Sequence, residues 1–301
     1  RAGRWQAEAP TERLEEAQMG VRAVDGSGLT QEWRVPLQVE PLGDGWRQRR
    51  LVAHALLGID GAWQRLTRDP RGGLLAIDGR QLVHLRPGWS GSAAVPVQED
   101  LSISAPQALV PLGDELFVLD AGQRAVLVLA RDGVLRRRIG QLREPVDLAV
   151  RPDGVCLVAD ADLGGVMVYE ASGMLRCRLG RPGEGADAFA EIAAIALDPA
   201  GGCYVLDRRA LRIHHFDHHF RRGPVLTVPV PEEQQPVDCA VGPLGLMVLL
   251  DDGRILIYNE HGDATRALPP VTDSGLVERL EAPATLSVDA DGSLLVASPD
   301  D

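Results

Sequence analysis

The sequence predicts an all-β fold, a six-bladed β-propeller of four-stranded antiparallel blades, and two observations indicate it. A turn followed by an apolar run recurs six times along the 301 residues, at intervals of 42, 40, 47, 44 and 47 residues. The composition, with 33 Gly and 21 Pro, is typical of many short strands joined by tight turns. Repeats of about 40 to 50 residues that hold four strand-like segments are the sequence signature of propeller blades.

Each repeat divides into four expected strands. The first is a short apolar run such as PVDLAV (145–150), and the second follows a turn and ends at an acid, as in DGVCLVAD (153–160). The third resembles GVMVYE (165–170), and the fourth resembles VLRRRIG (134–140). We therefore expect blades at residues 61–88, 105–140, 143–179, 190–228, 234–268 and 281–301.

The last repeat holds only two strands before the sequence ends at Asp301. Residues 19–35, with the turn DGSG at 25–28, match the missing third and fourth strands. We expect these N-terminal strands to complete the C-terminal blade, because ring closure removes open strand edges. Residues 1–18 are expected to form a linker or short helix, with Thr11 as an N-cap candidate, and residues 36–60 an insertion into the 19–301 propeller.

One residue type recurs at the end of the second strand. The six ends are Asp78, Asp120, Asp160, Asp207, Asp251 and Ser298. A short carboxylate at this place can accept backbone N–H bonds from the turn that follows it. Because the acid repeats from blade to blade, we assign it to blade stability rather than to catalysis.

The fourth repeat, RLGRPGEGADAFAEIAAIALDPAGGCYVLD (178–207), resembles the NHL repeat. The matching positions are Gly180, Gly183, Gly185, Phe189, Asp198, Pro199, Gly201 and Asp207. Residues 142–169 are a second match, and the resemblance extends over most of residues 19–301. It implies a propeller fold. NHL-like propellers include scaffolds, RNA-binding modules and several hydrolases and lyases, so the resemblance does not imply one function.

Aligning the repeats places one residue of each blade near the start of the innermost strand. These residues are Arg65, Gln107, Asp147, Ala194, Asp238 and Thr285. Function in propellers is usually found at one mouth of the central channel, where these strand starts converge. Because five of the six side chains are polar, we expect this ring to line water or a ligand.

The residues of the ring allow two chemical interpretations. The preferred one is a solvated polar channel without a cofactor. In the alternative, Asp147, Asp238 and Gln107 hold Ca²⁺ or another divalent cation, since such ions take oxygen ligands. The ion would act as a Lewis acid in a metal-dependent hydrolase of the lactonase or esterase type, with Glu144 or Glu191 as the general base.

Four of the seven histidines lie in the segment IHHFDHHF (213–220). Counting along the repeat places it in the third strand and the next turn, at the rim of the blade. Strand alternation sends adjacent histidines to opposite faces. His215 and Asp217, with His218 or His219, could form an adventitious Zn²⁺ or Ni²⁺ site, but closed structural sites need four ordered ligands, so no physiological metal is expected.

The net charge of the chain indicates which class of partner it can bind. The chain has 31 basic residues, all of them Arg, against 43 acidic residues, and its net charge is −12. This balance disfavours nucleic acid as a partner. Interface hot spots are rich in Trp and Arg, so we expect a protein partner at the 36–60 insertion. The candidate contact residues are Trp46, Arg47, Arg49 and Arg50. An extra hairpin that covers the channel is the other interpretation.

No apolar run reaches the roughly 18 residues that a membrane span needs, so we expect a soluble protein without membrane insertion. The four cysteines lack a metal-binding spacing. Cys156 and Cys203 are expected in adjacent blades, about 10 Å apart and beyond disulfide reach. Unpaired cysteines favour a cytoplasmic location. The chain begins at Arg1 without a signal-peptide segment, which indicates a processed product or a fragment.

These observations favour a non-catalytic propeller that serves as a protein-interaction or scaffold module of a larger assembly. The alternative is the metal-dependent hydrolase with its site at the channel mouth.

Overall fold

The computed structural model describes residues 17–24, 30–37, 63–86, 92–185, 187–230, 233–259, 261–268, 284–288 and 294–297. The chain divides into two compact units, residues 1–59 with 272–279 and residues 60–271 with 280–301. All regular elements of the described residues are β-strands. Within the described part of the chain, no helix has the length and apolar character that crossing a membrane requires.

The larger unit contains five four-stranded antiparallel sheets, each with its strands in sequence order. The first holds β3 (Trp63–Arg68), β4 (Leu74–Asp78), β5 (Gln81–Leu85) and β6 (Ser92–Ala94). The second holds β7 (Pro106–Leu112), β8 (Glu115–Asp120), β9 (Ala125–Ala130) and β10 (Leu135–Ile139). The third holds β11 (Pro145–Val150), β12 (Cys156–Asp160), β13 (Gly165–Tyr169) and β14 (Leu175–Leu179). The fourth holds β17 (Ile192–Leu197), β18 (Cys203–Asp207), β19 (Arg212–Phe216) and β20 (Arg222–Thr227). The fifth holds β21 (Pro236–Gly242), β22 (Gly245–Leu250), β23 (Ile255–Tyr258) and β24 (Ala264–Leu268).

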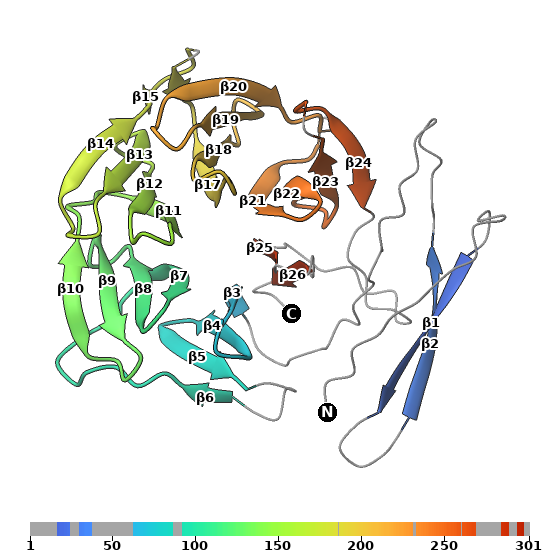
Figure 1. Ribbon diagram of the computed structural model, residues 1–301, viewed down its shortest axis with the longest axis horizontal. Coiled ribbons are helices and arrows are strands. Elements are labelled where there is room, and N and C mark those ends of the chain that lie inside the picture. The colour runs from blue at the N-terminus through green and yellow to red at the C-terminus, as the bar shows by residue number, and fades with distance from the viewer. Residues whose placement is uncertain are drawn as a thin grey trace. The chain divides into compact units, whose positions relative to one another are not determined.

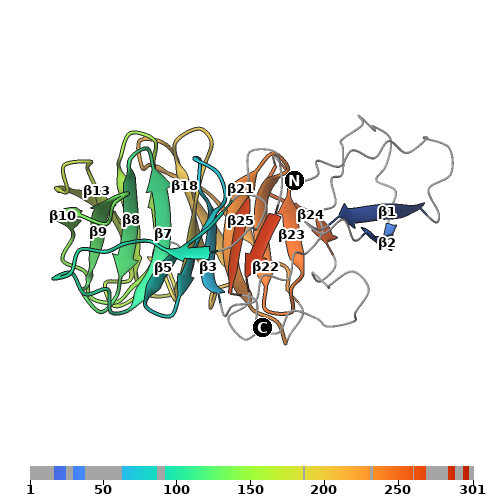
Figure 2. The same ribbon diagram turned by 90° about the horizontal axis from the view of Figure 1, so that it is seen from below.

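These sheets are arranged as the blades of a propeller (Figure 1), with the first strand of each blade at the centre and the fourth at the rim. In the side view the strands run from one face of the ring toward the other (Figure 2). The prediction of a β-propeller with four-stranded antiparallel blades is confirmed.

The count of six four-stranded blades is not what the described residues show. The sixth place, between β21 and β3, holds a two-stranded sheet of β25 (Thr285–Val288) and β26 (Leu294–Ala297). The strands expected to complete it, β1 (Ala17–Val24) and β2 (Thr30–Leu37), pair with each other in the other unit. Repeat spacing cannot determine whether β1 pairs with β26, because these strands come from opposite ends of the sequence.

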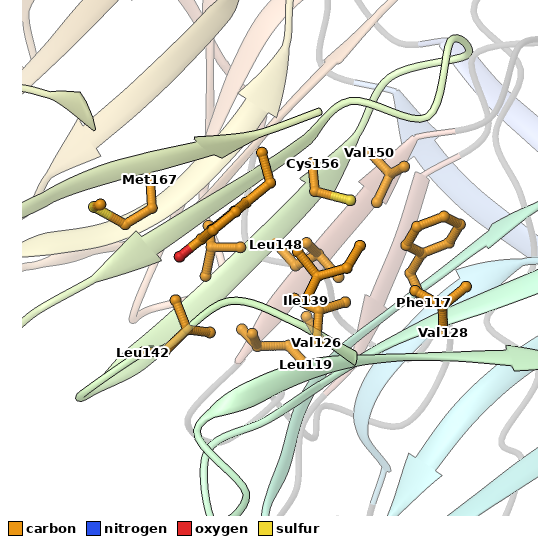
Figure 3. Packing of buried hydrophobic residues seen from close by; sticks show 13 residues of the cluster. Phe117, Leu119, Val126, Val128, Ile139, Leu142, Leu148, Val150, Cys156 and Met167 are labelled. Carbon is orange, nitrogen blue, oxygen red and sulfur yellow. The ribbon is translucent and has the colours of Figure 1, made fainter. Parts of the chain in front are cut away.

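Apolar side chains fill the space between adjacent blades. Strands β8, β9 and β13 are buried along nearly their whole length, since both faces of an inner strand pack against a neighbouring blade. Between the second and third blades, Phe117 and Val128 on one sheet face Leu148 and Val150 on the other (Figure 3). The core is therefore a series of sheet-to-sheet interfaces around the ring.

The recurrent Asp residues link two loops of a blade in three of the repeats. Asp120, Asp160 and Asp207 are fully buried. The Asp120 carboxylate accepts backbone N–H bonds from Ser104 and Ala105 before the first strand, and from Gly122 and Gln123 after the second. Asp160 and Asp207 bond the corresponding loops of the third and fourth blades. These acids therefore stabilise the ends of their blades.

The two remaining Asp positions depart from this pattern. Asp78 lies opposite Trp63 at the expected register but is exposed. In the fifth blade the residue opposite Pro236 is Leu250, and Asp251 follows it as an exposed turn residue. The sequence alignment of Asp251 with the other acids is therefore wrong by one residue.

Candidate functional site at the central channel

The innermost strands surround a central cavity of about 250 Å³. In the five complete blades the pairing of the first and second strands shifts at the second residue of the first strand, which marks a bulge. The residue after the bulge has the same register position in each blade. These residues are Arg65, Ala108, Asp147, Ala194 and Asp238, and Thr285 has this position in β25.

This register corrects one sequence assignment. Gln107 is the bulged residue and its side chain is exposed, whereas Ala108 holds the equivalent position and is buried. The turn that joins the first two strands is shorter in the second blade, where Leu112 pairs with Glu115, than in the third, where Val150 pairs with Cys156. An alignment that counts a constant number of residues back from the terminal Asp therefore reaches Gln107 instead of Ala108. Gln107 contributes only its backbone carbonyl to the site.

Arg65 lies at the centre of this ring and contacts four other blade elements. Its Nη2 donates to Oδ1 of Asp147 at 2.6 Å, and its Nη1 donates to Oδ2 of Asp238 and Oγ1 of Thr285, both at 3.1 Å. Its Nε donates to the carbonyl oxygen of Gln107 at 3.2 Å. We call Arg65, Asp147, Asp238 and Thr285 the Arg65 cluster. It joins β3 to β7, β11, β21 and β25.

The two carboxylates also accept backbone N–H bonds. Oδ2 of Asp147 accepts from Ile195, and Oδ2 of Asp238 accepts from Leu286. Oδ1 of Asp238 accepts from Cys239 in its own strand. All four carboxylate oxygens therefore have a donor. Asp147 links β11 to β17, and Asp238 links β21 to β25, so each acid joins neighbouring blades.

The Arg65 cluster is largely withdrawn from water. The side chains of Asp147 and Asp238 are 5% and 4% exposed, and that of Arg65 is 19% exposed. Burial lowers the pKa of Arg65, but the negative charges of Asp147 and Asp238 outweigh this effect and raise it. Burial raises the pKa of Asp238 to about 6; Arg65 opposes the rise and the charge of Asp147 adds to it. The guanidinium therefore stays charged between two carboxylates.

Arg65 provides the positive charge that the alternative interpretation assigned to a metal ion. The carboxylate oxygens of Asp147 and Asp238 already accept hydrogen bonds from Arg65 and from backbone N–H groups. Among the described residues no group of three or more His, Cys, Asp or Glu side chains could hold a metal ion. The residues present in the channel fit a buried ion-pair cluster better than a Ca²⁺ site, which takes six to eight oxygen ligands.

The two candidate general bases are not part of this cluster. Glu191 is exposed, and its carboxylate accepts bonds from Arg208, including one from Nε at 3.0 Å. Glu144 is also exposed. Their backbone carbonyls accept N–H bonds from Arg208 and Ala161, the residues that follow the buried acids of their blades. Both glutamates therefore lie in the loops that precede the first strands of their blades.

The histidine segment lies where the repeat predicted, in β19 and the turn after it. Nε2 of His215 is 2.7 Å from Oδ2 of Asp198, and its ring stacks on Tyr204 with centroids 4.6 Å apart. Asp217 accepts N–H bonds from His219 and Arg221, and the bond from Arg221 lowers the pKa of Asp217. The ring centroids of His218 and His219 lie 3.8 Å apart. These groups are therefore engaged within the blade and its turn.

The cysteines are unpaired, as expected. Burial raises the pKa of Cys156 and Cys203 to about 12, so both thiols stay protonated at neutral pH. The partner-contact candidates Trp46, Arg47, Arg49 and Arg50, with the whole 36–60 insertion apart from residues 36 and 37, lie outside the described residues.

Sequence reasoning placed Arg65 in the channel but missed its role as the central donor. One signal could have revealed it: a single cation stands in an otherwise acidic or neutral ring, at the same repeat position as two Asp residues. Equivalent positions of a propeller converge on one axis, so these charges had to meet.

The fold and the channel define a β-propeller. No protein-family model matches the chain, and no curated protein matches it by sequence. A streptogramin B lyase is similar in structure, with a TM-score of 0.59 and 13% identity over 93% of this chain and 84% of that one. A catalytically inactive His-to-Ala variant of virginiamycin B lyase from Staphylococcus aureus, with quinupristin, gives a TM-score of 0.59 and 11% identity over 94% and 95% of the chains. A nidogen/laminin complex gives a TM-score of 0.54 and 15% identity over 65% of this chain and 75% of that one. Identities this low establish the fold alone.

Proposed function

We propose that this protein is a non-catalytic propeller that serves as a protein-interaction or scaffold module. The observation that carries the proposal is the Arg65 cluster. A propeller hydrolase needs, at the channel mouth, either a cation with an open ligand position or a general base that can reach the substrate. Here the guanidinium of Arg65 takes that place and pairs with both candidate carboxylates at 2.6 and 3.1 Å.

The composition of the innermost strands supports the same conclusion. A structurally similar lyase loses activity when one histidine is replaced by alanine. Among the described residues of β3, β7, β11, β17, β21 and β25 there is no histidine. An enzyme of that type would need another general acid or base; Glu144 and Glu191 are exposed at the ends of their blades, and the Glu191 carboxylate is paired with Arg208.

The partner surface is assigned to the 36–60 insertion on sequence grounds. Trp46 with Arg47, Arg49 and Arg50 supplies the aromatic and guanidinium groups that dominate interface hot spots. The nidogen/laminin complex is a precedent for a propeller that takes part in a protein complex.

Two further points belong to the proposal. Kinship with NHL repeats rests on the third and fourth blades, where Asp160 and Asp207 close the loops that the repeat pattern matched. Closure into six blades rests on β1 and β2, which would supply the third and fourth strands beside β25 and β26. Each open strand edge is an aggregation hazard, and closure would remove it.

The test uses a photo-reactive amino acid at position 46 to trap the partner, which is then identified and purified. Calorimetry with the purified partner should show at least roughly 10-fold weaker binding for Trp46→Ala and Arg47→Ala, as expected for hot-spot residues. Arg143→Ala, an exposed arginine of the third blade, is the matched control. Unchanged affinity in both variants, or turnover of lactones and esters by the wild type, would contradict the proposal.

A further inference from the structure

A second cavity, of about 350 Å³, lies at the outer part of the interface between the third and fourth blades. We call it the outer pocket. It is bounded by β14, by β19 and β20, and by the loop of the two-residue strands β15 (Arg181–Pro182) and β16 (Ala188–Phe189). These elements lie side by side in Figure 1, at the rim of the ring. The glycine-rich segment and the histidine segment, which the sequence singled out separately, meet at this pocket.

The outer pocket is basic although the protein as a whole is acidic. Arg178, Arg181 and Arg222 line it, with Asp187 as the one acid among its lining residues. Arg222 pairs with Asp187, and Arg178 donates to the carbonyl of Leu163. Among the described residues no hydrogen-bond partner is found for the Arg181 side chain. Two positive charges are therefore left over in a chain of net charge −12, and Arg pairs readily with carboxylate and phosphate groups.

Aromatic side chains form the remaining wall. Phe189 and Phe216 are buried, and Phe220 is half-buried at the edge. Arg176 and Arg151 lie over the Phe220 ring at 5.2 and 5.9 Å from its centroid. Phenyl faces beside guanidinium groups suit a ligand that carries both a planar ring and an anionic group.

Phe220 occupies a position that the same turn gives to glycine elsewhere. The turns between third and fourth strands share one pattern of backbone bonds, and Gly133, Gly173 and Gly262 sit in it with φ between 83° and 88°. Phe220 has φ of 63° at the equivalent place. A bulky residue in this left-handed region is strained. Glycine would fit without strain, so the phenyl ring is present for a reason other than the turn.

His214 supplies a buried donor beside the same pocket. Its side chain lines the cavity, and the residue is 2% exposed. Nη2 of Arg222 lies 3.0 Å from Nδ1 of His214. Because a guanidinium only donates, Nδ1 accepts, and the proton of the neutral ring is on Nε2. Nε2 is buried and has no hydrogen-bond partner among the residues that the structure describes. An acceptor group of a ligand would satisfy it, since unpaired buried donors cost free energy.

From this geometry we propose that the outer pocket binds an organic anion with an aromatic ring. Arg181, with Arg222, takes the anionic group, and Phe189, Phe216 and Phe220 take the ring. The volume suits a single-ring or indole-sized ligand. The anion can be a free small molecule or the carboxylate at an aromatic C-terminus of a peptide, and the experiment separates these sources.

The experiment is calorimetry on the full chain with indole-3-acetate and phenyl phosphate as small-molecule probes. Indole-3-acetamide is the neutral control. A short peptide that ends in Trp, with a free or an amidated C-terminus, forms the peptide arm. We expect saturable binding below about 1 mM for an anionic probe, with no binding of its neutral counterpart.

Two variants test the assignment of residues. Arg181→Ala removes an exposed guanidinium and should weaken anion binding by roughly 10-fold, as one charge-assisted bond predicts. Phe220→Gly should weaken ring binding to a similar extent while the fold is retained, because glycine relieves the strained turn. Arg143→Ala is the matched control and should leave affinity unchanged.

Three outcomes would overturn the proposal. The first is the absence of saturable binding for every anionic probe. The second is equal binding of acid and amide. The third is binding that neither Arg181→Ala nor Phe220→Gly alters. Since Arg181 is exposed, its variant tests the site even where a change at Phe220 affects folding.

Discussion

At the scale of single residues, Arg65 is the side chain on which the channel depends. Two buried carboxylates at equivalent repeat positions would repel each other, and the guanidinium between them offsets that repulsion. A planar group with five donors can reach Asp147, Asp238, Thr285 and a backbone carbonyl at once, as it does here. A lysine would supply the charge without this geometry.

Replacing Arg65 with Met should destabilise the protein by roughly 3–5 kcal/mol, because it leaves Asp147 and Asp238 buried without a cation. Urea denaturation measures this loss. Adding Asp147→Asn and Asp238→Asn to Arg65→Met should restore part of the lost stability, since the uncompensated charges are then absent. Equal stability of Arg65→Met and wild type would show that the cluster is not a stabilising element.

His214 predicts a defined pH dependence. Burial lowers its pKa to about 4, with Arg222 acting in the same direction, whereas the unfolded chain titrates near 6.5. Between these values the unfolded state binds a proton that the folded state does not. The free energy of unfolding should therefore fall as pH drops from about 6.5 toward 4.

The measurement compares urea denaturation of wild type and His214→Gln between pH 7 and 4.5. The difference isolates His214, because other groups, including Asp238 with its raised pKa, are common to both proteins. Wild type should lose more stability over this range than the variant. Parallel curves would mean that His214 is accessible to protons in the folded state.

At the scale of elements, the buried acid at the end of β8 should matter far more than its counterpart at the end of β4. Asp120→Ala removes the acceptor of four backbone N–H groups and should cost roughly 2–4 kcal/mol. Asp78→Ala is the matched control, and its exposed side chain should contribute within about 0.5 kcal/mol. Thermal unfolding of both variants checks the contrast, and similar losses would contradict the assigned role.

Elements could be predicted from the sequence because strand alternation and turn spacing are local signals. The strands of the second to fifth blades follow the repeat closely. Register is harder to predict from sequence: a shorter turn between β7 and β8 puts Ala108 rather than Gln107 at the channel position, and the fifth blade has Leu250 where Asp251 was expected. Which side chains pair with one another is still harder to predict from the sequence. The contacts of Arg65 join residues up to 220 positions apart, and periodicity does not show which donor meets which acceptor.

At the scale of the whole molecule, the ring is held by contacts between successive blades, and the sixth place holds only two strands in the described residues. Our proposal assigns the missing strands to the N-terminal segment. Deleting residues 1–37 should then expose an edge next to β26 and make the protein more prone to aggregate.

Hydrogen exchange of the deletion variant should show reduced protection in β25 and β26, with β8 and β9 in the opposite half of the ring much less affected. Protection of β25 and β26 identical to that of the full chain would contradict closure by the N-terminal strands.

We infer that a guanidinium, rather than a metal ion, balances the channel carboxylates. Elemental analysis of untagged protein, purified without chelator and compared with Asp147→Asn/Asp238→Asn, tests it most directly. We expect divalent ions to be substoichiometric in the wild type and unchanged in the double variant. A stoichiometric ion in the wild type that disappears with the two carboxylates would contradict it and favour the hydrolase.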